Sequence, residues 1–243
     1  MRRGFQAAAE RLAAEVREEL GLEADDRFDP GRLADAYGIP TVALTDLSGD
    51  GADPRAIRHL TIVDNGCFSA ATVFTGTARF IVYNPTHSDR RLANSLAHEL
   101  AHVLLEHEPG PLLGPGGCRT WDREVEAEAD TLAGMLLVPR QGALAIARVG
   151  LPHAVGAARF GVSLELMRWR TGQSGAAKQA AAEARRWEQR LPAAGAFQDA
   201  VPSLEEMAWL ADLSAPTWRS LLRRCAAAIA SEARHQLYAL LAQ

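Results

Sequence analysis

The stretch Leu96-Ala-His98-Glu99-Leu-Ala-His102-Val-Leu104 lies inside a predicted helix that runs from Ser88 and Asp89 to about His107. Two histidines four residues apart lie one above the other on one face of such a helix, so both imidazoles can reach the same metal ion. The adjacent face is apolar and is expected to be buried, with Leu92, Leu96, Leu100, Val103 and Leu104. The stretch therefore predicts a packed helix that carries a pair of metal-binding side chains.

Glu99 adds a candidate general base to this pair of histidines. It follows the first histidine directly, so its carboxylate can address a metal-bound water instead of the metal itself. The pattern His-Glu-x-x-His is typical of zinc peptidases, in which the glutamate acts as the general base. Because the pattern also occurs by chance, a third ligand decides whether a catalytic site is present.

Two residues beyond the motif are poor candidates for that third ligand. Glu106 lies on the same helix face as the histidines, but too far along the axis to share one ion with His98. His107 comes five residues after His102 and is therefore off that face. We expect His107 to face solvent near the end of the helix.

A second helix, predicted from about Asp122 to Val138 and ended by Pro139, carries the better candidate. Glu126 and Asp130 are four residues apart and share a face next to an apolar stripe of Val125, Ala129, Leu132 and Leu136. We expect Glu126 to bind the metal and Asp130 to accept the remaining N–H of a ligating histidine, which would fix that histidine's tautomer. Glu124 and Glu128 are expected to point away from Glu126 by about half a turn.

The segments around these helices predict an α+β fold. Helices are expected at 5–20 and 31–37, strands at 41–44, 60–63, 68–74 and 78–83, and a hairpin turn at 75–77. Loops are expected at 46–55 and 109–117, a break at 192–195, and final helices at 203–241. The expected architecture is a small twisted sheet packed on the helix with the two histidines, followed by an α-helical C-terminal half. Its expected divisions are 1–140, 141–172 and 173–243.

Composition restricts the class of protein. The chain has 243 residues, of which 48% are apolar and 23% charged, with a formal net charge of −4, so disordered and collagen-like classes are excluded. No stretch approaches about 18 consecutive apolar residues, and charges interrupt the N-terminal helix pattern, so we expect neither a membrane span nor a signal peptide. Cys67, Cys118 and Cys225 are too scattered for a disulfide framework and are expected to be reduced thiols in a cytoplasmic protein.

A second class of function is indicated by a basic segment. Between positions 140 and 190, the sequence has nine basic residues and only three acidic ones. Within it, residues 154–170 combine two short helices with a glycine turn, which resembles a helix-turn-helix. Arg168 and Arg170 lie on the second of these helices, whereas Met167 and Trp169 look like core residues. The alternative, which we do not favour, is a metal-containing DNA-binding transcriptional regulator that performs no proteolysis.

The two motifs together resemble those of the ImmA/IrrE-type metallopeptidases, thermolysin-like zincins of bacteria and their mobile elements. The resemblance rests on His98-Glu-Leu-Ala-His102 with Val103-Leu-Leu105 behind it, on Glu126-Ala-Glu-Ala-Asp130, and on Met135-Leu-Leu-Val-Pro139. The strand Phe80-Ile-Val-Tyr-Asn84 and the helix pair leading into Gly38-Ile-Pro40 also match, so about residues 5–172 are covered. Asp130 departs from the asparagine that the family often carries, but it keeps the hydrogen-bonding role.

The resemblance implies a zinc-dependent, site-specific endopeptidase that cleaves a separate helix-turn-helix repressor and so relieves repression of stress or mobile-element genes. Zinc would be held by His98, His102 and Glu126, with Glu99 as the general base, although manganese or iron also accept this ligand set. The strand 78–83 would be the edge strand with which an extended substrate pairs. Tyr83 and His87 are the nearest candidate donors to the transition state, and no membrane partner is expected.

Overall fold

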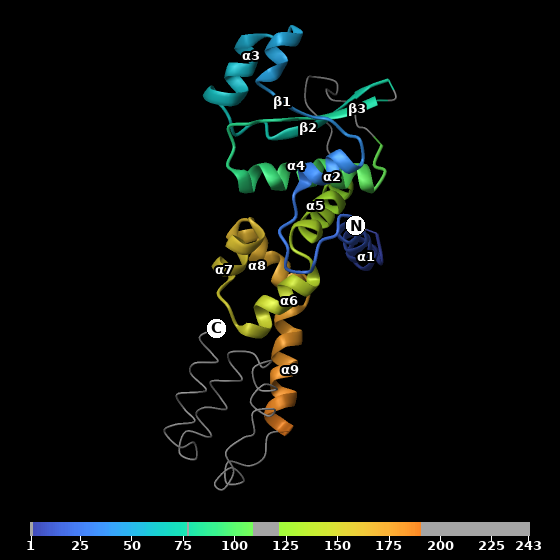
Figure 1. Cartoon of the computed structure of the whole chain (residues 1–243), viewed down its shortest axis with the longest axis vertical. Coiled ribbons are helices and arrows are strands. Elements are labelled where there is room, and N and C mark those ends of the chain that lie inside the picture. Colours follow the sequence, from blue (N-terminus) through green and yellow to red (C-terminus); the bar gives the residue numbers. More distant parts are fainter. Residues whose placement is uncertain (1, 77, 109–121, 191–243) are drawn as a thin grey trace.

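The computed structural model describes residues 2–76, 78–108 and 122–190 (Figure 1). A three-stranded sheet packs on α4 (Asp89–Leu104), the helix that carries both histidines, and the residues from Arg123 to Arg190 are helical. This arrangement confirms the predicted α+β class. The expected loop at 109–117, the break at 192–195 and the helices at 203–241 lie outside the described residues.

Two N-terminal helices form where they are predicted. α1 (Phe5–Glu19) packs against α5 (Arg123–Leu137), and α2 (Pro30–Ala36) packs against α4. α2 begins at Pro30 because the carboxylate of Asp29 accepts the N–H of Gly31 at 2.9 Å, and proline at the first position loses no helical hydrogen bond.

The strand order of the sheet is β1–β3–β2. β1 (Thr41–Ala43) runs parallel to β3 (Ala78–Tyr83), and β2 (Ala70–Thr75) pairs with β3 antiparallel. β3 is therefore the central strand, and the prediction that 78–83 forms the edge is wrong. The reason is a pairing distant in sequence, since β1 occupies the side of β3 that the hairpin leaves open. β2 is the edge strand next to α4.

The prediction of a strand at 60–63 is also wrong. These residues belong to η2 (His59–Val63), a π-helix that continues directly from α3 (Pro54–Arg58). α3 begins because the carboxylate of Asp53 accepts the N–H of Arg55 at 2.9 Å. The helix that starts at this cap continues through the segment despite the β propensity of its residues. Ile62 and Val63 therefore do not enter a sheet and remain exposed. The expected loop at 46–55 likewise contains a short 3₁₀-helix, η1 (Asp46–Asp50).

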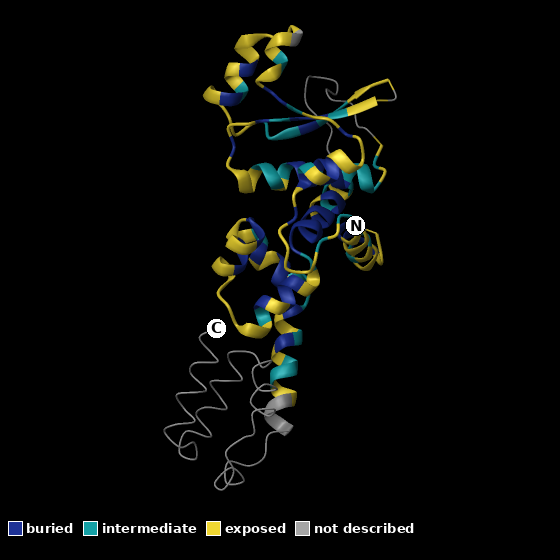
Figure 2. Cartoon of the chain, viewed as in Figure 1, coloured by how far each residue is buried: buried dark blue, intermediate teal, exposed yellow. Residues whose placement is uncertain are grey.

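The apolar core is centred on the contact between α4 and α5, and Figure 2 shows the buried residues gathered there. Leu96 and Leu100 of α4 are buried, as are Ala129, Leu132 and Leu136 of α5, in agreement with the predicted stripes. The core contact fixes the relative position of the two helices. It therefore also fixes the polar side chains that lie beside the two stripes.

Within residues 122–190, four further helices follow α5: α6 (Arg140–Val149), α7 (His153–Phe160), α8 (Leu164–Gln173) and α9 (Ala176–Arg190). The chain bends by 58° between α5 and α6, at Pro139. α9 packs against α6, where the Arg148 guanidinium donates to the Glu183 carboxylate at 2.8 Å and holds the pKa of Glu183 at about 2. Among the described helices, none taken alone could cross a membrane by length and apolarity, although α5 and α6 taken together would pass that test.

Candidate metal centre

Three side chains from α4 and α5 converge on one point. The Nε2 atoms of His98 and His102 are 3.0 Å apart. Oε2 of Glu126 lies 3.2 Å from Nε2 of His98 and 3.7 Å from Nε2 of His102. All three residues are half-buried. The structure thus brings together the three residues that the sequence suggested as ligands.

The spacing of these three atoms fits a tetrahedral metal ion. Zinc binds histidine nitrogen and carboxylate oxygen at about 2.0–2.1 Å, so two of its ligand atoms are about 3.3 Å apart. The observed separations of 3.0, 3.2 and 3.7 Å bracket that value. Two imidazole nitrogens and one carboxylate oxygen are also a donor set that zinc, manganese and iron accept. The residues present therefore fit a divalent metal with three protein ligands.

The outer nitrogens of both histidines also have partners. Nδ1 of His98 lies 2.8 Å from Oδ1 of Asp130, which is the contact expected from the spacing on α5. Nδ1 of His102 lies 3.0 Å from Nδ1 of His107. Burial lowers the pKa of His98, but the hydrogen bond that its ring donates to Asp130 and the charges of Asp130, Glu99 and Glu126 together raise it above its ordinary value.

His107 is not at the surface, which corrects the prediction for this residue. α4 ends at Leu104, and Glu106 adopts a left-handed backbone conformation with φ of 53°. This reversal folds the chain back, so the His107 side chain is only 8% exposed and contacts His102. A left-handed residue other than glycine leaves no clear sequence signal, which is why helical spacing alone misplaced His107.

Behind His107 lies a buried carboxylate. Glu128 is 4% exposed, and its Oε2 is 3.6 Å from Nε2 of His107, just beyond hydrogen-bond length. Its two oxygens accept hydrogen bonds from the Arg2 guanidinium at 2.7 and 3.1 Å, and this pairing lowers the pKa of Glu128. A continuous line of contacts thus runs from His102 through His107 and Glu128 to Arg2. The helical pattern of α5 predicted no role for Glu128.

Glu99 is held by the edge strand. Its Oε2 accepts hydrogen bonds from both the backbone N–H and the hydroxyl of Thr72 on β2, each at 2.8 Å, and the residue is 5% exposed. Two donors on one oxygen fix the orientation of the carboxylate beside the histidines. Thr72 was not identified from the sequence, because nothing local marks which strand residue will face a helix 27 positions later.

The two residues suggested as transition-state donors lie elsewhere. The half-buried ring of Tyr83 packs against the apolar core. The His87 ring donates from Nε2 to the backbone C=O of Asn65 at 2.7 Å, before the start of α4. Within α4, His98 lies nine residues beyond Asp89, which corresponds to roughly 13–14 Å of helix. Among the described residues, no hydrogen bond or ion pair joins Tyr83 or His87 to the three converging side chains.

The helix-turn-helix-like segment forms two helices, α7 and α8, but its surface differs from the expectation. Arg170 is fully buried, where its guanidinium donates to the C=O of Val138 and to the Glu10 carboxylate, each at 2.7 Å. Burial lowers the pKa of Arg170, and the charge of Glu10 opposes that effect. Met167 is buried as expected, whereas Trp169 is 40% exposed and is not a core residue. Arg170 thus serves packing and is not available to contact nucleic acid.

Comparison with known families gives one match. A peptidase family model, described as the IrrE N-terminal-like domain, matches residues 34–171. No curated protein and no solved structure gave a match. The matched region covers more than half of the chain and includes α4 and α5 with their converging side chains. The chain therefore belongs to the peptidase family that is defined by the IrrE N-terminal-like domain.

Proposed function

We propose that this protein is a zinc-dependent endopeptidase of the cytoplasm that cleaves a separate, repressor-type DNA-binding protein. The observation that carries the proposal is the triangle formed by Nε2 of His98, Nε2 of His102 and Oε2 of Glu126, with Glu99 next to it on α4. Membership of a peptidase family supports the same chemistry. The substrate class rests on the resemblance to ImmA/IrrE-type enzymes.

His98, His102 and Glu126 would hold the metal, which supplies a Lewis acid and makes a bound water acidic near pH 7. Both histidines present Nε2 to the shared point, so each ring would carry its proton on Nδ1 when Nε2 binds the metal. With the metal bound, the Nδ1–H of His98 would donate a hydrogen bond to Asp130, and the Nδ1–H of His102 would donate to Nδ1 of His107. The outer contacts thus fix both tautomers in the form that can bind a metal.

Glu99 would act as the general base through its second oxygen. Thr72 holds Oε2, so Oε1 is the atom that takes a proton from the attacking water and later gives it to the leaving amine. The carboxylate has to be oriented so that Oε1 can reach both the attacking water, which gives the proton, and the leaving amine, which receives it. The paired hydrogen bonds from one residue of β2 supply that orientation.

The edge of β2 that pairs with no other strand among the described residues is the proposed binding edge for an extended substrate. Thr72 lies opposite Ile81, and because its N–H points to Glu99, this is a pair without hydrogen bonds between the strands. The backbone groups of Ala70 and Phe74 point to the same edge, two residues away on either side. A peptide that adds to β2 would pair with the backbone of Ala70 and Phe74 and would pass Glu99, which already accepts the Thr72 N–H, between them. Such pairing restricts cleavage to segments that can become extended.

Metal analysis of the purified full chain tests the centre, and cleavage tests the activity. Glu99→Gln retains all ligands, so it is expected to carry as much zinc as the wild type, whereas Glu126→Ala is expected to lose one equivalent. Helix-turn-helix repressors of the same host are then incubated with wild type or Glu99→Gln. Fragments that form only with the wild type support the proposal. Equal zinc in wild type and Glu126→Ala, or fragments that form equally with Glu99→Gln, would contradict it.

A further inference from the structure

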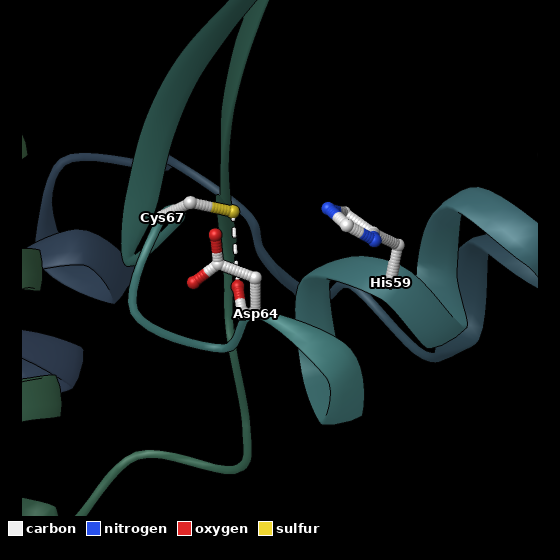
Figure 3. Close-up of side chains that lie close together, drawn as sticks. All are labelled: His59, Asp64 and Cys67. Atoms are coloured by element: carbon white, nitrogen blue, oxygen red, sulfur yellow. Dashed lines mark hydrogen bonds between the residues drawn. The ribbon is translucent and has the colours of Figure 1, made fainter.

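Three potential metal ligands of different chemistry gather on the surface between η2 and β2. His59 is the first residue of η2, Asp64 follows its last residue, and Cys67 lies in the turn that leads to β2. The imidazole, the carboxylate and the thiol each offer one atom, and these atoms all lie within 4.8 Å of one another. Figure 3 shows the sulfur of Cys67 and a ring nitrogen of His59 turned toward each other, with the carboxylate of Asp64 beside the sulfur.

A rare backbone turn produces this gathering. In an α-helix, residues five positions apart diverge by about 140° around the axis. Here the N–H of Asp64 donates to the C=O of His59 at 2.8 Å, which closes a wider π-type turn and brings both residues to the same side. Such turns are uncommon and occur frequently at functional sites. The Cys67 N–H then donates to the C=O of Asp64, and this bond carries the thiol back toward the other two ligands.

The backbone of the segment that carries the ligands is held by hydrogen bonds from three side chains. Asn84 is fully buried, and its amide nitrogen donates to the C=O of Leu60 at 2.8 Å and of Phe68 at 3.1 Å. His87 donates to the C=O of Asn65, and Arg91 donates to the C=O of Gly66. The backbone on both sides of Asp64 and Cys67 is therefore fixed. Among the described residues, no hydrogen bond or ion pair engages the side chains of His59 or Asp64.

We propose that His59, Asp64 and Cys67 form a second metal site, which binds a borderline divalent cation such as zinc. A thiolate and an imidazole select such cations over magnesium and calcium, and the carboxylate adds negative charge. Zinc would bring sulfur and nitrogen to about 3.5 Å from each other, so atoms that lie within 4.8 Å of one another have to approach by at most about 1.3 Å. All three side chains are exposed, and the Cys67 thiol, which donates a hydrogen bond to the C=O of Asp64 at 2.9 Å, would give up that bond to bind the metal, whereas the backbone beneath them is already in place. Three protein ligands leave the fourth position to water.

This site is separate from the proposed peptidase centre. Arg91, which contacts the loop, lies in the first turn of α4, and His98 lies seven residues further along that helix. Seven residues of α-helix correspond to about 10 Å. The proposal for His59, Asp64 and Cys67 therefore does not depend on the proposed function.

Cobalt(II) distinguishes the two sites by spectroscopy. A thiolate bound to cobalt gives an intense charge-transfer absorption, and the centre on α4 and α5 contains no thiolate. We would titrate the full chain with cobalt in a background in which Cys118→Ser and Cys225→Ser remove the other two thiols. The band is expected to appear with one equivalent and to vanish in Cys67→Ser. It is expected to persist in His98→Ala, which impairs only the other centre.

The remaining ligands are tested by affinity. His59→Gln and Asp64→Asn are each expected to weaken cobalt binding at this band by about tenfold or more, because one of three ligands is lost. His153→Gln, which changes an exposed histidine outside the cluster, is the matched control and should not shift the titration. Zinc should also slow the reaction of Cys67 with a thiol reagent. Absence of the band, or a band that neither His59→Gln nor Asp64→Asn weakens, would overturn the proposal.

Discussion

The contact of His107 with His102 predicts a specific loss of metal affinity when His107 is replaced by alanine. The wild-type His102 ring has a partner for Nδ1 at 3.0 Å, within a pocket where the His107 side chain is 8% exposed. Alanine removes that partner and also leaves the buried Glu128 without its contact at 3.6 Å. The His102 ring is then free to rotate or to carry its proton on the wrong nitrogen, and both changes oppose metal binding.

The expected loss of metal affinity follows from the contribution that such orienting partners make in other metal sites. Loss of the group that orients a ligating histidine typically reduces metal affinity by about 10–100-fold, which corresponds to about 1.4–2.7 kcal/mol. We expect His107→Ala to lie toward the larger value, because a buried partner is not readily replaced by water. Asp130→Ala provides the comparison. Its carboxylate is 71% exposed, so water can take its place at Nδ1 of His98, and the loss should be nearer tenfold.

The assay is a competition for zinc between each purified chain and a chromophoric chelator, in a Cys67→Ser background that removes the second proposed zinc site, with circular dichroism and urea unfolding as checks of the fold. His107→Gln is the rescue variant, since its amide can accept from His102 and donate toward Glu128 at once. We expect it to recover part of the affinity that alanine loses. A His107→Ala protein that is folded and binds zinc within about twofold of wild type would refute the role of this contact.

Three further predictions concern other contacts. Thr72→Val removes one of two hydrogen bonds to Glu99, so kcat should fall about tenfold or more while zinc content stays constant, and an unchanged kcat would argue against the orienting role. Glu10→Ala leaves the buried guanidinium of Arg170 without its charge partner and should lower the free energy of unfolding by about 3 kcal/mol in urea titrations, so a change below about 1 kcal/mol would contradict it. Glu183→Gln tests the pair between α6 and α9. Because Arg148 lowers the pKa of Glu183 from 4.5 to about 2, its stabilisation is complete above pH 4.5 and is lost as the pH falls toward 2. The difference in stability between wild type and Glu183→Gln, at most about 1 kcal/mol for this partly exposed pair, should therefore close over that range, and a difference that persists at pH 2 would contradict the assignment.

Helical spacing made part of the site predictable. A period of 3.6 residues places His98 above His102 and Glu126 above Asp130, and the apolar stripes of α4 and α5 force these faces together. The contact of Asp130 with His98 follows from the same geometry. The convergence of side chains from two helices could therefore be inferred without a structure.

Contacts that depend on irregular or distant pairing could not be predicted. The pairing of β1 with β3 decides which strand forms the edge, and no local pattern encodes that choice. The left-handed turn at Glu106 returns His107 to the site, although the residue type gives no warning of it. The segment at 60–63 has the composition of a strand, but the cap at Asp53 makes it helical. These three errors arose from a pairing between distant strands, a left-handed turn and a helix cap, none of which hydrophobic periodicity encodes.

The central claim is that Glu99 and the three converging ligands cut a protein, and a comparison of new protein N-termini tests it most directly. Cells of the native host would express either the wild type or Glu99→Gln, and all new N-termini would be identified. The account predicts at least one new terminus, within a repressor-type DNA-binding protein, that forms with the wild type and not with Glu99→Gln. A set of termini that is the same for the two proteins, with zinc bound to both, would contradict the claim.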